Sequence, residues 1–339
     1  MRGATAPVPP SQRRVRIPHG LVTALRVGAS AGLLALLIII SRDELSALDV
    51  GSKSAAAAWL TGAALVIAAA FVMAAVRWWQ VADTLDVRVS GRSTLSIYLA
   101  ALFVGNFLPT TIGGDVLRVN RLARICGSQA NAFATVIIER LTGWVVLPLL
   151  TLAALILQPS LLRHSGGQIA GGLALGTLVV LALIVWVAEH PRGLGRLAGG
   201  TRIREALGAV HTGLSVFRRH PGAAGRLLTV GLAYQFLLVV ATALAGAAIG
   251  VNPGLRAWLA FAPMVLIVQN LSAIGGLGVR EGALVLFLDA HGVNEGEAVL
   301  LGLLVYALTL LVSLTGAPAL ALGGRRNRSK VPAEVPAGS

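Results

Sequence analysis

Apolar runs of about 20 residues recur along this chain, and they limit it to one broad class of fold. A helix of that length crosses the hydrocarbon core of a bilayer, because it satisfies its backbone hydrogen bonds internally. Of the 339 residues, 56% are hydrophobic and 12% are charged, which is outside the range of soluble proteins. We therefore predict an all-α polytopic membrane protein.

About six of these runs fit complete spans. They cover residues 27–40, 55–76, 132–158, 169–188, 227–249 and 298–322. The segment 77–79, Arg-Trp-Trp, follows the second run and is typical of an interfacial belt, so we give it no role in binding. Over about 201–219, apolar residues recur every three or four positions, which predicts an amphipathic helix on the membrane surface or on the protein's own inner face.

The span pattern divides the chain into three parts. We predict a basic tail, a transmembrane domain and a second basic tail, over residues 1–20, 21–322 and 323–339.

Two stretches break the apolar pattern with the same order of residues. Asn106 to Arg124 reads NFLPTTIGGDVLRVNRLAR, and Gln269 to Glu281 reads QNLSAIGGLGVRE. Irregular backbone exposed to lipid leaves costly unpaired groups, so each stretch lies in water or lines a cavity. The apolar arm over 95–108 is short for a crossing, and we therefore predict two re-entrant helical hairpins.

The distribution of basic residues sets the predicted orientation. With both stretches as hairpins, 22 Lys and Arg residues lie at the cytoplasmic face and four at the other, a strong positive-inside bias. Both termini are then cytoplasmic in a multi-pass protein of the cell membrane. The segments around one hairpin repeat around the other in the opposite orientation, which is the inverted repeat of alternating-access carriers.

The candidate substrate-binding residues lie in the two broken stretches and in one charged pair between them. Ionisable groups deep in a membrane are costly and are usually functional or paired. Glu139 and Arg140 are adjacent and point about 100° apart on a helix, so we expect them to pair with other segments. The full set is Asn106, Thr110, Thr111, Gly113, Gly114, Asp115, Arg118, Arg121, Glu139, Arg140, Gln269, Asn270, Gly275, Gly276, Arg280 and Glu281.

Three roles are open for the charged residues. Arg118, Arg121 and Arg124 would share one helical face, which suits bidentate capture of a phosphate or carboxylate headgroup. Arg121 and Arg124 could instead anchor the protein to anionic lipid. A purely structural lattice, in which Asp115 or Glu281 neutralises an arginine across the repeats, is the third interpretation.

Three motifs carry a resemblance to a known family. They are L-P-x-x-x-G-G-D-x-x-R at 108–118, the Glu139-Arg140 pair, and G-G-L-G-V-R-E at 275–281. In these motifs the chain resembles the lysylphosphatidylglycerol synthase transmembrane, or flippase-like, family, over about residues 20–322. The resemblance implies an eight-helix-type domain that moves lipids between leaflets, with aminoacylated phosphatidylglycerol or other pathway lipids as cargo.

Two departures from the family pattern matter. The chain has no cytosolic aminoacyl-transferase part, so we expect the flippase part alone, with a separate lipid-modifying enzyme as a partner. The second tip reads Ser272-Ala273-Ile274 where many relatives place a proline, so the resemblance does not imply a headgroup preference.

The competing class is a membrane enzyme, a lipid-linked glycosyltransferase that would use Asp43 and Glu44 in the first outer loop. Against it, the predicted outer loops are short and the scattered histidines suggest no metal site. The single cysteine, Cys126, excludes an internal disulfide. We favour a transporter over an enzyme and predict no metal or other cofactor.

The predicted function is a lipid flippase for an anionic or lipid-linked headgroup, of the aminoacyl-phospholipid or polyprenyl-phosphate type. The net charge of +14 then reflects topology and anionic phospholipids at the cytoplasmic face, and we predict no nucleic-acid partner. The sequence is also compatible with a homo-oligomer.

Overall fold

The computed structural model describes residues 53–107, 113–190, 201–271 and 278–325, and the side chains of a few residues at the ends of these segments are not described. All regular structure within them is helical. Five of the described helices are long and apolar enough to cross a membrane: α2 (Lys53–Thr84), α5 (Gln129–Leu157), α6 (Ser165–Glu189), α9 (Pro221–Ala248) and α12 (Glu295–Ser313). The prediction of an all-α, multi-pass membrane protein is confirmed, while the predicted first span, 27–40, lies outside the described residues.

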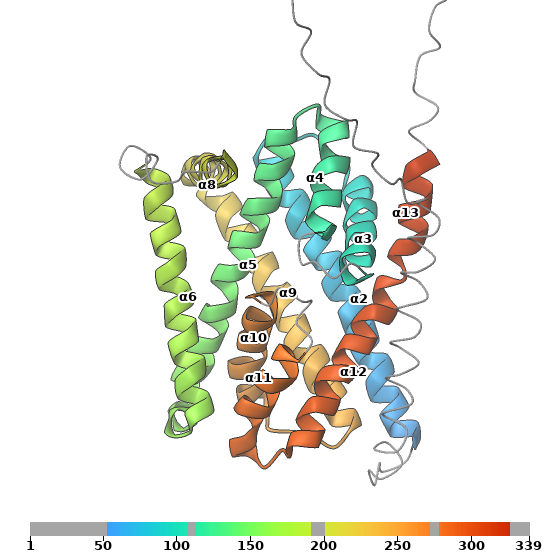
Figure 1. Cartoon of the computed structure of the whole chain (residues 1–339), viewed down its shortest axis with the longest axis vertical. Helices are drawn as coiled ribbons and strands as arrows, with labels where there is room; N and C mark the ends of the chain where they lie inside the picture. Colours follow the sequence, from blue (N-terminus) through green and yellow to red (C-terminus); the bar gives the residue numbers. More distant parts are fainter. Residues whose placement is uncertain (1–52, 108–112, 191–200, 272–277, 326–339) are drawn as a thin grey trace, which may run out of the picture.

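Two pairs of shorter helices fill the space between the long ones (Figure 1). In the first pair, α3 (Gly91–Phe107) packs on α4 (Gly113–Cys126), and in the second, α10 (Leu255–Leu271) packs on α11 (Val279–Leu288). Figure 1 shows the first pair in the upper half of the molecule and the second in the lower half. This is the placement expected for two hairpins in opposite orientation, and their depth in the bilayer stays a prediction.

The last predicted span is wrong in one respect. It was expected to be one helix over 298–322, but the structure divides it into α12 and α13 (Gly316–Arg325). The break allows α13 to follow α3 closely, since a β-carbon at Gly316 would overlap the carbonyl oxygen of Leu99. A glycine is therefore needed where the two helices meet.

Local sequence signals explain several helix ends. Ser128 caps α5 by accepting a hydrogen bond from the Asn131 amide at 3.2 Å. Asn294 and Glu297 form a capping box at the start of α12, with bonds of 2.9 and 3.1 Å.

Each hairpin rests on its own apolar cluster. The α3–α4 pair packs on α2 and α5 through buried residues that include Trp78, Leu122 and Val136. The α10–α11 pair packs in a larger cluster that includes Phe261 and Phe287, whose rings stack with centroids 5.4 Å apart. The two hairpins thus rest mainly on different apolar clusters, with Leu102 of α3 in contact with both.

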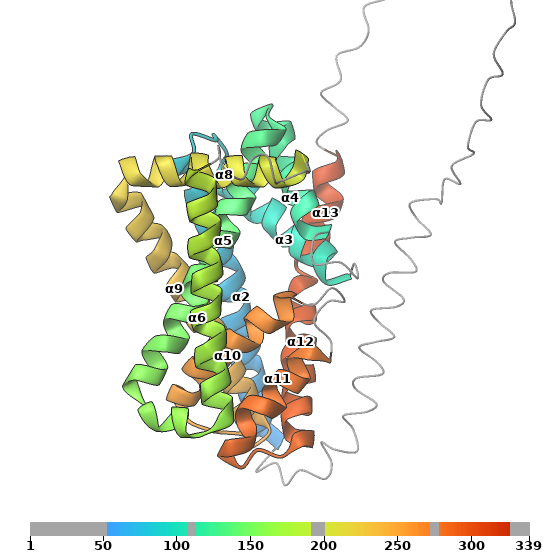
Figure 2. The ribbon, with the colours of Figure 1, turned by 60° about the vertical axis from the view of Figure 1, so that its left-hand side comes forward.

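The amphipathic segment forms α8 (Thr201–Arg219), which lies across one end of the bundle (Figure 2). Its Ala209 and Val210 are buried, and a β-carbon at Gly213 would overlap the side chain of Ile138 in α5. Of the two predicted placements, the structure has the helix docked on the protein itself. We call this end of the molecule the α8 end.

The interfacial assignment of Arg77 and Trp78 is wrong. Helix α2 continues to Thr84, and the α3–α4 hairpin covers its last turns, so Arg77 and Trp78 are 5% and 1% exposed. Only Trp79, at 37% exposure, is partly open.

Candidate functional site

A cavity of about 300 Å³ lies between α2, α3, α4, α5, α9 and α10. We call it the central pocket. It brings together both broken stretches and the charged pair between them, because seven of the sequence-predicted residues line it: Asn106, Gly114, Asp115, Arg118, Glu139, Arg140 and Gln269. Sequence reasoning missed other members of the lining, notably Arg77, Tyr98, Trp144, Tyr234 and Gln235.

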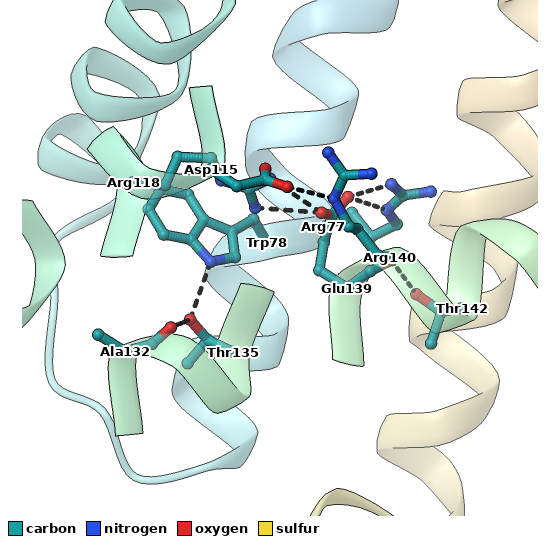
Figure 3. Close-up of polar contacts among 9 residues, drawn as sticks. All are labelled: Arg77, Trp78, Asp115, Arg118, Ala132, Thr135, Glu139, Arg140 and Thr142. Atoms are coloured by element: carbon teal, nitrogen blue, oxygen red, sulfur yellow. Dashed lines mark hydrogen bonds and ion pairs between the residues drawn. The ribbon is translucent and has the colours of Figure 1, made fainter. Parts of the chain in front are cut away.

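Glu139 is the centre of the charge network at the pocket (Figure 3). Its Oε1 accepts hydrogen bonds from Nε of Arg77, at 3.0 Å, and from Nη2 of the same residue. Its Oε2 accepts from both Nη atoms of Arg118, each at 3.1 Å. One buried carboxylate from α5 therefore binds a guanidinium from α2 and another from α4, which offsets the cost of burying all three groups.

Arg118 is also in contact with two aromatic rings. Its guanidinium carbon lies 4.3 Å from the ring centroid of Trp78 and 4.9 Å from that of Tyr98. The Trp78 indole N–H donates to the Thr135 hydroxyl at 3.1 Å, which fixes the ring (Figure 3). Cation–π contacts of this kind add to the ion pair and restrict the Arg118 side chain to one orientation.

Arg140 and Asp115 form the second ion pair of the network. Asp115 is also 3.4 Å from Arg118, three residues away on α4. The adjacent Glu139 and Arg140 thus pair with other helices, as expected from their positions on α5. The side chain of Arg140 is 38% exposed, so this pair lies at the more open part of the network.

The pocket has more positive than negative groups. Among the described residues, its lining contains the guanidinium groups of Arg77, Arg118 and Arg140 and the carboxylates of Asp115 and Glu139, a formal net charge of +1. Helix α4 begins beside the pocket, with Gly114 in the lining, and the amino-terminal end of a helix carries partial positive charge. The electrostatics of the site therefore favour an anion.

Four buried polar atoms of the lining have no hydrogen-bond partner within the described part of the chain. They are Nη1 of Arg77, Nε of Arg118, Nδ2 of Asn106 and Oε1 of Gln235. The residues Arg77 and Gln235 are each 5% exposed, so bulk water does not fully solvate them. A buried polar group without a partner costs about 1–3 kcal/mol, which a polar ligand would recover.

Glycines make room for the Arg77 side chain. A β-carbon at Gly143 would lie 3.3 Å from Nη1 of Arg77, and one at Gly231 would lie 3.7 Å from its Cδ. These two positions on α5 and α9 let a long side chain from α2 cross the helix interface to reach the pocket.

The second charged pair lies elsewhere. Arg280 and Glu281 are buried and form an ion pair with each other, and neither lines the central pocket. Glu281 also accepts from the Gly278 amide at 2.6 Å at the start of α11, and Arg280 lies 5.1 Å from the ring centroid of Tyr306. This pair therefore differs from Glu139 and Arg140, because its two charges already neutralise each other locally.

The expected row of three arginines is also divided. Arg118 faces the pocket, Arg121 donates to the backbone carbonyls of Ala319 and Leu320 in α13 at 3.2 and 3.1 Å, and Arg124 is exposed. Gly113 begins α4 without lining the pocket. Of the remaining predicted residues, Thr110, Thr111, Gly275, Gly276 and the side chain of Asn270 lie outside the described residues.

The family comparison agrees with this architecture. The sequence family described as the lysylphosphatidylglycerol synthase TM region matches residues 22–316. The chain belongs to this family. The match includes every residue of the central pocket, and it confirms the resemblance that the sequence motifs indicated. No curated protein matches the chain.

Among the lining residues that sequence reasoning missed, Arg77 could have been found from its position in the sequence. Arg77 lies on α2 at helical spacing from the buried positions Ala70 and Ala74, so it could have been assigned to the inner face of a longer helix. Tyr234 and Gln235 had no such signal, since they are ordinary polar residues within an apolar run.

Proposed function

We propose that the protein is a lipid flippase that moves a lipid with an anionic or lipid-linked headgroup between the leaflets of the cell membrane. The headgroup would be of the phospholipid or polyprenyl-phosphate type. The observation that carries the proposal is the surplus of guanidinium groups in a cavity enclosed by membrane helices, with buried polar atoms that have no hydrogen-bond partner among the described residues. Membership of a flippase-like family supports it.

The size of the pocket suits a headgroup and not a complete lipid. Pockets for small molecules span about 300–1,000 Å³, and this one is at the lower limit. The long helices expose apolar side chains on their outer faces, for example Leu65, Ile156 and Val179 at 67%, 76% and 67%. The headgroup would enter the pocket while the hydrocarbon tails stay in the bilayer.

The charge distribution supports an α8 end that faces the cytoplasm. The helix ends and connections there carry Arg88, Arg92, Arg124, Arg218 and Arg219 among the described residues. Those at the opposite end carry Lys53, Arg163 and Arg256. By the positive-inside rule the α8 end is cytoplasmic, where its arginines would bind anionic phospholipids.

Transport would use the two hairpins as opposing gates. The pocket is lined by the inner part of the α3–α4 hairpin and by Gln269 near the end of α10. Movement of one repeat against the other would open the pocket first to one leaflet and then to the other. The Glu139 network would keep the bound headgroup between α2, α4 and α5 during that change.

The alternative function, a lipid-linked glycosyltransferase, depends on Asp43 and Glu44. Both lie outside the described residues, and no described observation favours this activity. The double variant Asp43→Asn with Glu44→Gln tests it directly, because an enzyme of this type would lose its activity.

The deciding experiment measures transbilayer movement in proteoliposomes with leaflet-resolved lipid probes. Wild type is compared with Arg77→Gln, which removes the free guanidinium edge of the pocket. Arg124→Gln is the matched control, because it removes an exposed arginine from α4 outside the pocket. We expect wild type and Arg124→Gln to move one lipid class and Arg77→Gln to move it at least about tenfold more slowly.

Two results would overturn the proposal. One is absence of movement of any tested phospholipid or polyprenyl-phosphate lipid by folded wild-type protein. The other is equal movement by Arg77→Gln and wild type, which would place the transport route outside the central pocket.

A further inference from the structure

The charge of the central pocket restricts which headgroup it can hold. Three arginines and two acidic residues line it, and all five are tied into ion pairs around Glu139 and Asp115 in the lining itself. The tip segments 108–112 and 272–277 contain no ionisable residue, so their sequence adds no charge. A ligand with one negative charge therefore leaves the described site neutral, while a dianion or a cation leaves a buried excess.

The polar atoms without partners restrict the headgroup further. Nη1 of Arg77 can only donate a hydrogen bond, which suits an anionic oxygen. Gln235 and Asn106 present carboxamides to the pocket, and a carboxamide has a donor end and an acceptor end. A hydroxyl group both donates and accepts, so it satisfies either amide in either orientation.

We propose that the central pocket selects a lipid phosphodiester with a single negative charge whose headgroup carries hydroxyl groups. The phosphate lies against Arg77, and the hydroxyls bond the amides of Gln235 and Asn106. The hydroxylated part is a polyol on a phospholipid or a sugar on a polyprenyl phosphate, since both share this chemistry. The inference rests on the proposed function and narrows its cargo: it excludes net-cationic aminoacyl headgroups, zwitterions, phosphomonoesters and diphosphates.

The test measures calorimetric binding of water-soluble headgroups to the full chain in detergent. The hydroxylated monoanions are glycerophosphoglycerol and a methyl hexosyl phosphate, one for each lipid source. Dimethyl phosphate has the same charge without hydroxyls, glycerol 3-phosphate adds a charge, and glycerophosphocholine is zwitterionic. We expect at least one hydroxylated monoanion to bind about tenfold or more tightly than each of these three, a difference of about 1.4 kcal/mol. The tighter of the two identifies the lipid source.

Isosteric variants make the charge argument independent of folding defects. Asp115→Asn raises the formal pocket charge by one unit and should shift selectivity about tenfold towards glycerol 3-phosphate. Gln235→Leu should leave binding of dimethyl phosphate unchanged and remove the advantage of the hydroxylated probes. Asp83→Asn, at an exposed position of α2, is the control that should alter neither preference.

The outcomes separate this inference from the proposed function. Preference of the wild type for glycerol 3-phosphate or glycerophosphocholine, or unchanged selectivity in Asp115→Asn, overturns the inference. If such a preference accompanies pocket-dependent transport, the flippase proposal survives with another cargo. If the expected binding order holds and no lipid moves between leaflets, the inference stands as a binding site and the flippase proposal fails.

Discussion

The two hairpins share a sequence pattern, but their charged residues behave differently. In α4, Asp115 and Arg118 bond to side chains of α5, and Arg118 joins α2 through the shared Glu139 carboxylate. In α11, Arg280 and Glu281 bond to each other. The first arrangement leaves a pocket with a net positive charge and open hydrogen-bonding atoms, while the second is locally neutral. The comparison indicates that a shared motif marks both hairpins, whereas the neighbouring helices decide which one retains an excess of positive charge beside a cavity.

The largest expected difference between the hairpins is in stability. Glu139→Gln leaves Arg77 and Arg118 buried without their shared carboxylate, which should cost about 3–5 kcal/mol. Glu281→Gln removes the charged partner of Arg280 alone, and the glutamine can still accept the hydrogen bond from the Gly278 amide. The expected loss of stability is therefore about 1–3 kcal/mol. Thermal unfolding in detergent, followed by circular dichroism, measures both, with the exposed Glu295→Gln as control. Equal losses in the two variants would contradict the comparison.

The second largest expected difference between the hairpins is in the rate of lipid transport. Arg118→Gln should slow lipid movement at least about tenfold, because it removes a guanidinium from the pocket. The double variant Arg280→Met with Glu281→Gln should move lipid at nearly the wild-type rate, since a buried ion pair can often be replaced by uncharged groups of similar size. Leaflet-resolved transport in proteoliposomes is the measurement. A double variant as slow as Arg118→Gln would make the second hairpin part of the substrate route.

Packing at one glycine near the start of α4 and one near the start of α11 gives a smaller contrast. A β-carbon at Gly114 would lie 2.7 Å from the Ala101 carbonyl oxygen, so Gly114→Ala should destabilise the protein by about 1–3 kcal/mol. Gly282, in the first turns of α11, has nothing within 4 Å of that position, so Gly282→Ala should stabilise it by up to about 1 kcal/mol. The unfolding midpoints of the two variants should therefore move in opposite directions. A shared direction would show that the hairpins are packed alike.

The smallest expected effect concerns pH. Partial burial, and then the nearby His164, lower the pKa of His291 in η2 (Asp289–His291), which follows α11 outside the membrane-spanning segments. A histidine with a lowered folded pKa stabilises the fold above its unfolded pKa of about 6.5 and loses that contribution as pH falls below it.

The unfolding midpoint should therefore drop slightly between pH 7.5 and 5.5, and His291→Gln should reduce that drop. The first hairpin contains no histidine. Between pH 7.5 and 5.5, hydrogen-exchange protection should therefore change in the second hairpin and stay constant in the first. Equal pH responses of the two hairpins in hydrogen exchange would contradict this assignment.

Much of the pocket could be predicted because intramembrane charge is conspicuous in an apolar chain. Asp115, Arg118, Glu139 and Arg140 were identified from their position in or beside apolar runs, and all four line the pocket. Arg77 was missed because tryptophans follow it, which matches an interfacial belt, and its burial depends on a hairpin that follows it in sequence.

The sequence by itself determined the membrane class, five helices long and apolar enough to cross a membrane, the helical segment at 201–219 and the family, because apolar length, periodicity and motif spacing are local properties. Only the tertiary structure decided the partners of each charge. In that structure Glu139 bonds two arginines from different helices, Arg121 bonds the backbone of α13, and Arg280 pairs with the adjacent Glu281. The physical reason is that an ion pair depends on which helix faces cross, and helix crossings are set by packing across the whole bundle.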